Sequence, residues 1–324
     1  MRRPLVTWTL VVAVIAGAFG LTVLVLNNSV YNATGYVMSY LDALARKDAA
    51  GALEIIGGVP DGSDASDALL RRSAMADLSD LRVVGDTANS DGSHRVTVAY
   101  AVDGAENRIA FEVRPTGTLF GLFTDWEFVG GPLSTMYVTV VGDARFTANG
   151  LDLVSPTPDD PAGYLVFAPG SYELVHRTTY LESTPHTVAI KDPGSSVPAA
   201  VAVSPNALMV ERVQADVDRI LDTCATQEVL MPTGCPFGQS MGNRIISAPV
   251  WSIVEYPEVS IREGERSGQW VVPGTSGVAH LVVDVRSLFD GSVSTFDEDV
   301  PFSVSYVIAF LPGDELLITA QYSS

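Results

Sequence analysis

The chain has 324 residues, of which 19 are lysine or arginine and 38 are aspartate or glutamate, so its formal net charge at pH 7 is −19. A surface this acidic repels phosphate backbones and anionic headgroups, which excludes the class of basic nucleic-acid-binding proteins. The length is too great for one small core, so we expect several domains.

The N-terminal segment is apolar. Arg2 and Arg3 are followed by no charged residue until Asp42, and the 22 residues from Leu5 to Leu26 are almost all apolar. As a helix this run would be about 33 Å long, enough to cross a hydrocarbon core of about 30 Å. We therefore expect a cytoplasmic tip at residues 1–4 and one membrane-spanning helix at residues 5–27 in contact with the lipid bilayer.

A cleaved secretory signal is the alternative, because Ala16-Gly17-Ala18 has the small-residue spacing that signal peptidase accepts. The apolar run continues past this site to Leu26, which favours a retained signal anchor. Two arginines before the run predict a cytoplasmic N-terminus and a C-terminal ectodomain outside the cell membrane.

Residues 28–130 are expected to form an α+β domain. Apolar residues recur at helical spacing between Val37 and Leu44, and a second helix is expected to end at Gly57-Gly58. Alternating residues at 95–102 and 108–114 predict two antiparallel strands, and 125–129 predict a last one. This pattern is typical of helices packed on one face of an antiparallel sheet.

The loop at residues 60–67 is polar and leads to an expected third short helix that carries Leu69, Leu70 and Met75. Its aspartates, at positions 61, 64 and 67, fall every third residue rather than every second as in a calcium-binding loop. We favour a solvated loop in which Asp67 caps the third helix.

Residues 131–192 show no helical period and predict a small all-β sandwich. The expected strands are 136–141, 145–148, 164–168, 171–176 and 187–190. A linker rich in proline, glycine and serine is expected at residues 193–198.

Residues 199–324 are expected to form a second α+β domain. Its helix is predicted to begin with Ser204 as the N-cap and Pro205 at the first helical position. The expected apolar face of this helix contains Met209, Val213, Val217, Ile220 and Cys224. The strands expected after it are 250–254, 269–272, 279–285, 302–310 and 316–320.

Cys224 and Cys235 are the two cysteines of the chain. One ends the expected helix and the other follows a Pro/Gly-containing return, so in an oxidising compartment we expect a disulfide between them. A metal site would need further ligands, which the neighbouring sequence does not offer.

Three stretches carry a resemblance to known families. The order of helices and strands ending in Trp126-Glu127-Phe128 resembles the NTF2-like (cystatin-like) fold, and the stretch from Tyr137 through Asn149-Gly150 to Tyr172 looks like a PEGA-type β-module. The whole arrangement resembles uncharacterised membrane-anchored envelope proteins of high-GC Gram-positive bacteria and is distantly similar to the teicoplanin-resistance-associated membrane protein family. This resemblance implies two NTF2-like units flanking the small β-sandwich.

The sequence contains no catalytic, phosphate-binding or cofactor motif. Its histidines, at positions 94, 176, 186 and 280, have no metal-ligand spacing and are expected to be surface or structural residues. An enzyme would require His94 or His280 to point into a cone-shaped cavity beside a carboxylate. We therefore expect no enzymatic activity, no catalytic residues, no cofactor and no bound metal.

The predicted function is that of a non-catalytic extracytoplasmic cell-envelope protein that binds a membrane-protein or cell-wall partner. One alternative is a small-ligand carrier or sensor that uses an NTF2-like cone lined by aromatic side chains such as Trp126 or Trp270, although core filling is the favoured role of these aromatics. The other alternative is an uncharacterised enzyme.

Overall fold

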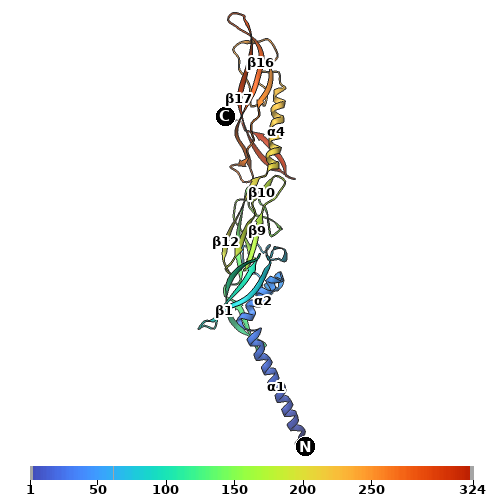
Figure 1. Cartoon of the computed structure of the whole chain (residues 1–324), viewed down its shortest axis with the longest axis vertical. Helices are drawn as coiled ribbons and strands as arrows, with labels where there is room; N and C mark the ends of the chain where they lie inside the picture. Colours follow the sequence, from blue (N-terminus) through green and yellow to red (C-terminus); the bar gives the residue numbers. More distant parts are fainter. Residues whose placement is uncertain (1–2, 61, 322–324) are drawn as a thin grey trace. The chain divides into compact units, whose positions relative to one another are not determined.

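The computed structural model describes residues 3–60 and 62–321; the side chains of residues 3–7, 9, 10 and 28 lie outside the description. The chain is mostly β, with 46% strand and 20% helix (Figure 1). The expected α+β class, with two NTF2-like helix-and-sheet units, is therefore wrong. The main reason is strand length, because alternations predicted as short strands belong to strands of up to 19 residues.

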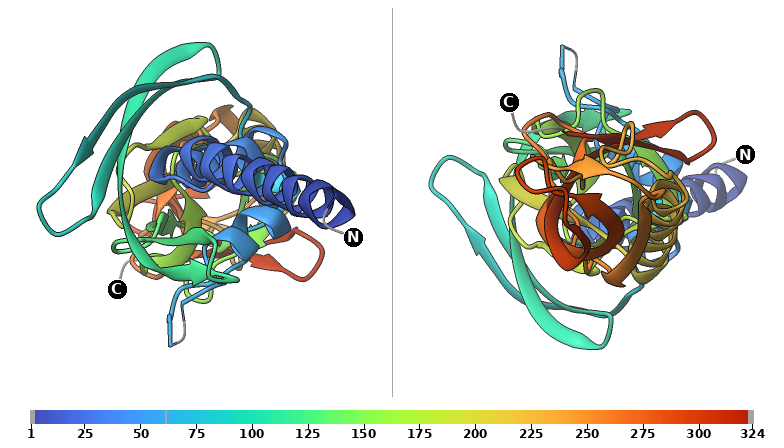
Figure 2. Two further views of the ribbon diagram at one scale, coloured as in Figure 1. Left: turned by 90° about the horizontal axis from the view of Figure 1, so that it is seen from below. Right: turned by 90° about the horizontal axis from the view of Figure 1, so that it is seen from above.

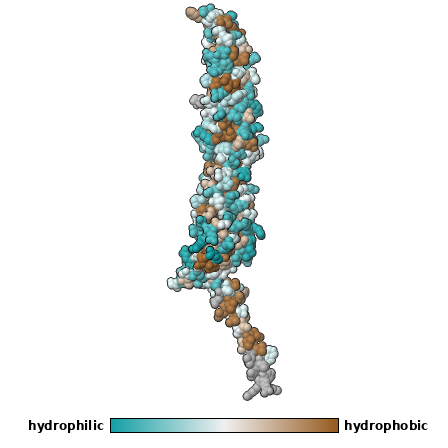
Figure 3. All heavy atoms as spheres, in the orientation of Figure 1, coloured by the Kyte–Doolittle hydropathy of each residue, from teal (hydrophilic) through white to brown (hydrophobic). Residues whose placement is uncertain are grey.

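The first helix, α1, runs from Arg3 to Ser29. Its described side chains are mostly apolar and exposed, including Val12, Ile15 and Leu24, and they appear brown in Figure 3. Within the described residues, however, no helix combines the length and the apolarity that crossing a membrane requires.

This finding corrects the expected membrane-spanning helix at residues 5–27, the signal anchor and the membrane assignment that followed from them. The expected cytoplasmic tip includes residues 1 and 2, which lie outside the described residues.

Two compact units make up the chain. The first contains Met1–Thr139, Arg145–Leu174 and Pro185–Ala200. The second contains Val140–Ala144, Val175–Thr184 and Val201–Ser324. The domain boundaries expected at residues 130, 192 and 198 stay a prediction.

The first unit begins, after α1, with two helices and a four-stranded antiparallel sheet. The helices are α2 (Ala33–Ala45) and α3 (Ala49–Ile55), and the strands, in sheet order, are β1 (Leu78–Ala88), β2 (His94–Val102), β3 (Ala105–Leu119) and β4 (Phe123–Phe128). Figure 2 shows the strong curvature of the long teal strands of this sheet. Tyr40 of α2 packs edge-on against Phe111 and Phe128, with ring centroids 6.0 and 5.3 Å away, so helix and sheet share one core.

Two features of this region differ from expectation. The predicted third helix is only a 3₁₀ turn at Arg72–Ala74. Strand β1 was not expected, because its sequence, including Arg82, Gly85 and Asp86, lacks apolar alternation and its residues are mostly exposed. Among the described strands it pairs with β2 alone, as an edge strand, so its sequence carries little signal of burial.

The region from Leu133 to Pro205 forms two four-stranded sheets. Their orders are β10-β12-β5-β8 and β11-β9-β6-β7. The strands are β5 (Leu133–Val141), β6 (Arg145–Ala148), β7 (Leu151–Val154), β8 (Ala162–Phe167), β9 (Gly170–Val175), β10 (Leu181–Ser183), β11 (His186–Ile190) and β12 (Ser196–Pro205). All five strands expected here are present, and β12 occupies much of the segment that was expected to be a linker.

The helix of the second unit, α4, runs from Ala207 to Ala225. Its N-cap is Asn206, whose side chain accepts a hydrogen bond from the Met209 N–H at 3.0 Å. The predicted cap, Ser204, and the predicted first helical residue, Pro205, instead end strand β12, so that prediction is wrong.

The sheet of the second unit is antiparallel and has six strands. Its strands are β13 (Arg244–Ile245), β14 (Val250–Glu255), β15 (Arg262–Glu263), β16 (Trp270–Arg286), β17 (Val293–Leu311) and β18 (Glu315–Ala320). The main order is β13-β16-β17-β18, and β14 and β15 also pair with β16. The strands expected at 269–272 and 279–285 are thus two parts of one strand, β16.

Strand β17 has one buried and one open face. Val300, Phe302, Val304, Tyr306 and Ile308 are less than 9% exposed. The residues between them are exposed or half-buried, which confirms the alternation predicted for 302–310.

Candidate functional site

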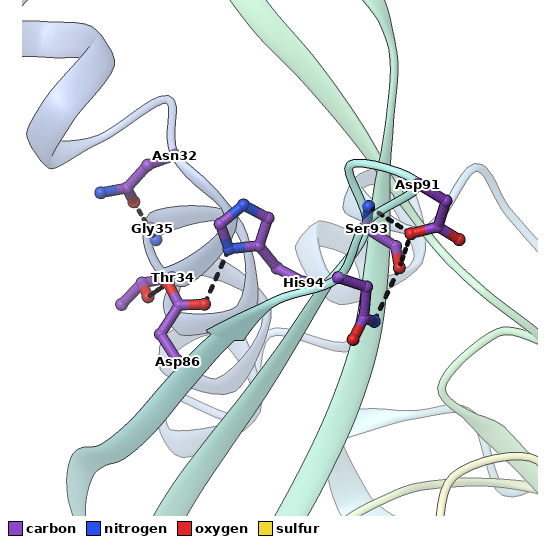
Figure 4. Close-up of polar contacts among 8 residues, drawn as sticks. Asn32, Thr34, Gly35, Asp86, Asp91, Ser93 and His94 are labelled. Atoms are coloured by element: carbon purple, nitrogen blue, oxygen red, sulfur yellow. Dashed lines mark hydrogen bonds and ion pairs between the residues drawn. The ribbon is translucent and has the colours of Figure 1, made fainter.

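Two of the histidines, His94 and His280, lie beside carboxylates. In the first unit, His94 Nδ1 lies 2.7 Å from Asp86 Oδ1, and the Thr34 hydroxyl donates to Asp86 Oδ2 at 2.9 Å (Figure 4). The Asp86 carboxylate therefore joins the end of β1 to β2 and to the first turn of α2. The side chains of His94 and Asp86 are 29% and 34% exposed.

The contacts of this cluster mainly stabilise the local structure. The His94 ring packs edge-on against Trp126 at a centroid distance of 5.3 Å, and the Trp126 indole N–H donates to the Tyr31 carbonyl at 3.0 Å. Nearby, Asp91 accepts hydrogen bonds from the N–H and hydroxyl of Ser93, which lower the pKa of Asp91. Each of these bonds fastens the β1–β2 turn or the entry to α2.

In the second unit, His280 lies between two carboxylates of the neighbouring strand β17. Its Nδ1 is 2.8 Å from Asp299 and its Nε2 is 2.9 Å from Asp297. The hydrogen bond to Asp299, followed by that to Asp297, raises the pKa of His280 above its usual value. The His280 side chain is 28% exposed, so this group lies on the open face of the sheet.

The other two histidines differ in burial. His176 is 1% exposed, with its Nε2 4.0 Å from Asp143 Oδ2, whereas His186 is exposed on β11. The expectation of surface or structural histidines agrees with these positions.

No arrangement for a metal ion was found within the described part of the chain, where no group of three or more His, Cys, Asp or Glu side chains is suitably placed. The aspartate-rich loop lies partly outside it, since residue 61 is not described. Ala65 and Ser66 of this loop run beside β8, where the Ser66 N–H donates to the Gly163 carbonyl at 2.8 Å.

The aromatic residues considered as the lining of a ligand cone mostly fill the core. Tyr100, Phe111, Trp251, Trp270 and Tyr306 are all at most 5% exposed. This finding confirms the favoured interpretation of these side chains.

The disulfide between Cys224 and Cys235 is confirmed, with the two Cα atoms 5.7 Å apart. It ties the C-terminal turn of α4 to the loop at residues 226–243, which also closes over the core through Phe237. Phe237 packs against Trp251 and Phe302 with ring centroids 5.0 and 5.4 Å apart. The loop therefore has a fixed position beside the sheet.

A groove of about 360 Å³ lies between this loop, α4 and the sheet. It is lined by Ile220 of α4, Gly234–Pro236 of the disulfide loop, Ser303–Tyr306 of β17, and Ile318, Ala320 and Gln321 at the end of β18. Of the described residues that form this lining, none has a charged side chain. Such a groove suits an apolar side chain.

The groove opens at the place where β17 becomes an edge strand. Among the described residues, strand β18 pairs with β17 from Leu311 to Tyr306, and the next bond on this side runs from the Gln321 N–H to the Ser305 carbonyl at 2.7 Å. From Val293 to Val304, no strand among the described residues pairs with this side of β17.

The backbone groups at this edge point outward at every second residue. Because residues of an antiparallel strand alternate between their two neighbours, Ser303, Asp299 and Asp297 direct N–H and C=O to the same side as Ser305. Pro301 offers only its carbonyl there. The edge can therefore accept one more strand over about ten residues.

Acidic side chains accompany this edge. Asp297 and Asp299 are 64% and 62% exposed and lie on the open face of the sheet, and Glu298 between them is also exposed. Charged residues and proline are common on edge strands because they hinder indiscriminate pairing. Here they also give the edge a strongly negative character.

Sequence reasoning missed this site for two reasons. The strand was expected to begin at residue 302, because the segment before it is polar and does not alternate. Ile220 was assigned to the buried face of the helix, but it is 36% exposed and Leu221 takes the buried position. The run Asp297-Glu298-Asp299 followed by Pro301 is the signal that could have indicated an edge strand.

Comparisons with protein-family models, with curated proteins and with solved structures give no match to this chain. The resemblance to bacterial envelope families therefore stays a prediction.

Proposed function

We propose that this protein is a non-catalytic binding protein that takes up an extended segment of a partner protein as an added strand on β17. The observation that carries this proposal is the open edge of β17 from Val293 to Val304, which begins beside an uncharged groove. In strand addition, main-chain hydrogen bonds supply affinity and side-chain pockets supply specificity. Here the edge of β17 offers the main-chain hydrogen bonds, and the groove offers the side-chain pocket.

The groove fits the geometry of an added strand. A partner residue opposite Val304 would direct its side chain to the same face of the sheet as Val304, where the groove is lined by Ile220 and Pro236. A volume of about 360 Å³ accommodates a large aliphatic side chain there. We expect the partner segment to carry a leucine or a similar residue at this position.

The charge of the edge favours a basic partner. Partner residues opposite Asp299 and Asp297 would lie on the open face with these carboxylates, and the whole chain has a net charge of −19. Lysine or arginine at these two positions would be attracted, and acidic residues would be repelled.

The disulfide supports an oxidising compartment as the place where this binding occurs, since disulfides are rare in the reducing cytoplasm. The partner is therefore proposed to be another protein exposed to that compartment.

The test is a binding measurement with a labelled synthetic peptide of twelve residues. The peptide carries leucine at position 1, lysine at positions 6 and 8, and threonine elsewhere. When it is added antiparallel with position 1 opposite Val304, the lysines face Asp299 and Asp297. Fluorescence anisotropy should show that the full-length protein binds it at least about tenfold more tightly than a peptide with glutamate at positions 6 and 8.

Two variants examine the two parts of the site. Ser303→Pro removes one outward N–H and should weaken binding about tenfold, whereas Ser303→Thr keeps the N–H and should bind like the wild type. Ile220→Asp places a charge in the groove and should also weaken binding, without altering the edge. Equal binding of the lysine and glutamate peptides, or wild-type affinity in both the Ser303→Pro and Ile220→Asp variants, would contradict the proposal.

A further inference from the structure

The loop that joins β16 and β17 lies at the other end of the open edge and carries exposed apolar side chains. Phe289 is 99% exposed, Leu288 is 73% exposed and Val293, the first residue of β17, is 57% exposed. Three large apolar side chains are thus exposed within six residues. We refer to Leu288, Phe289 and Val293 as the apolar tip.

The loop that carries the apolar tip is held in one conformation by side-chain hydrogen bonds. The Ser287 hydroxyl accepts from the Phe289 N–H at 3.2 Å, and Asp290 accepts from the N–H and hydroxyl of Ser292 at 3.1 and 2.8 Å. The Ser287 N–H also donates to the Ser292 carbonyl at 2.9 Å. Because the loop is braced in this way, little conformational entropy would be lost when Phe289 makes a contact.

The position of the apolar tip relates it to the open edge. Val293 begins the same strand whose edge residues 297, 299 and 303 point outward, so a segment added along β17 reaches the apolar tip after eleven residues (304 − 293). At about 3.3 Å per residue the groove and the apolar tip are about 36 Å apart along the strand. The edge is therefore flanked by the groove at one end and by the apolar tip at the other, and has carboxylates between them.

We propose that the apolar tip is a second anchor for the same partner, which must then be an extended segment of about twelve residues with apolar ends and a basic centre. This inference rests on the proposed function and names the chemistry of the partner. The groove holds the first apolar residue, Asp299 and Asp297 attract the basic residues, and Phe289 contacts a large apolar or aromatic residue at the far end. Exposed aromatic side chains are frequent hot spots of protein interfaces.

The experiment compares two peptides on three forms of the full-length protein. The first peptide has leucine at position 1, lysine at positions 6 and 8 and threonine at position 12; the second has tryptophan at position 12. We expect the tryptophan peptide to bind the wild type about tenfold more tightly than the threonine peptide. In the Phe289→Ser variant this advantage should disappear, while the affinity for the threonine peptide stays unchanged.

The matched control is Phe120→Ser, which removes another exposed phenylalanine, 87% exposed, from the β3–β4 turn. This variant should keep the full tenfold difference between the two peptides. If both peptides bind the wild type equally, or if Phe120→Ser loses the difference as Phe289→Ser does, the second anchor is refuted although strand addition stands. If neither peptide binds, the proposed function itself fails.

Discussion

His280 shows how one residue can stabilise the open face of the second unit. Its two ring nitrogens contact Asp299 and Asp297 of β17, and the residue opposite it on β14 is the uncharged Ser252. The charged groups that face it are therefore both acidic, and they raise the pKa of His280 by favouring the imidazolium. Both carboxylates can be satisfied at once only when the two ring nitrogens carry protons.

Stability should therefore depend on the protonation of His280. Because its pKa is higher in the folded than in the unfolded state, its contribution is fully present below about pH 6.5 and is lost as the pH rises through the folded-state pKa. We expect His280→Gln to lower the urea midpoint more at about pH 5.5 than at about pH 8.5. His186→Gln, on the exposed strand β11, is the control. A difference that is equal at both pH values would show that His280 acts through packing alone.

At the scale of elements, two neighbouring residues of α4 have different roles, since one stabilises the core and the other lines the groove. Leu221 is fully buried, so Leu221→Ala should lower the free energy of unfolding by about 2–5 kcal/mol. Ile220 is 36% exposed in the groove, so Ile220→Ala should cost less than about 1 kcal/mol but should weaken binding of the leucine-containing peptide. Urea denaturation and anisotropy together check this pair. Equal losses of stability in the two variants would mean that Ile220 contributes as much to the core as Leu221 does, and would contradict its place in the groove.

The elements that could be predicted from the sequence are those with a strong period or a specific turn. The turns at Asp103-Gly104 and Asn149-Gly150 have positive φ at all four residues, as their sequences indicate. The disulfide followed from the two cysteines and the expected helix end. Edge strands were missed or shortened, because a strand exposed on most of its surface needs no apolar alternation, as β1 and the first half of β17 show.

The candidate site depends on those same edge segments, so the sequence alone could not locate it. Neither Ile220 nor Asp297 differs in type from ordinary core or surface residues. What relates them is the place where β18 stops pairing with β17, which depends on long-range register and not on local sequence.

At the scale of the whole molecule, the excess of acidic residues should determine which segments can approach the open edge. A net charge of −19 attracts basic segments from a distance and repels acidic ones, while the main-chain bonds at the edge are the same for both. Selectivity among extended partners is therefore expected to be electrostatic. The affinity for an apolar side chain at the end of the segment depends on the groove instead.

This division predicts a specific dependence on salt. The Debye length falls from about 10 Å at 0.1 M to about 3 Å at 1 M ionic strength, so the exposed Asp297 and Asp299 should lose most of their attraction for lysine. Between about 0.05 and 0.5 M sodium chloride we expect the dissociation constant of the lysine peptide to rise about five- to tenfold. A peptide with threonine at positions 6 and 8 should change little over the same range, because its binding depends on the main chain and on the groove. If salt weakened both peptides equally, the carboxylates beside the edge would have no part in choosing the partner.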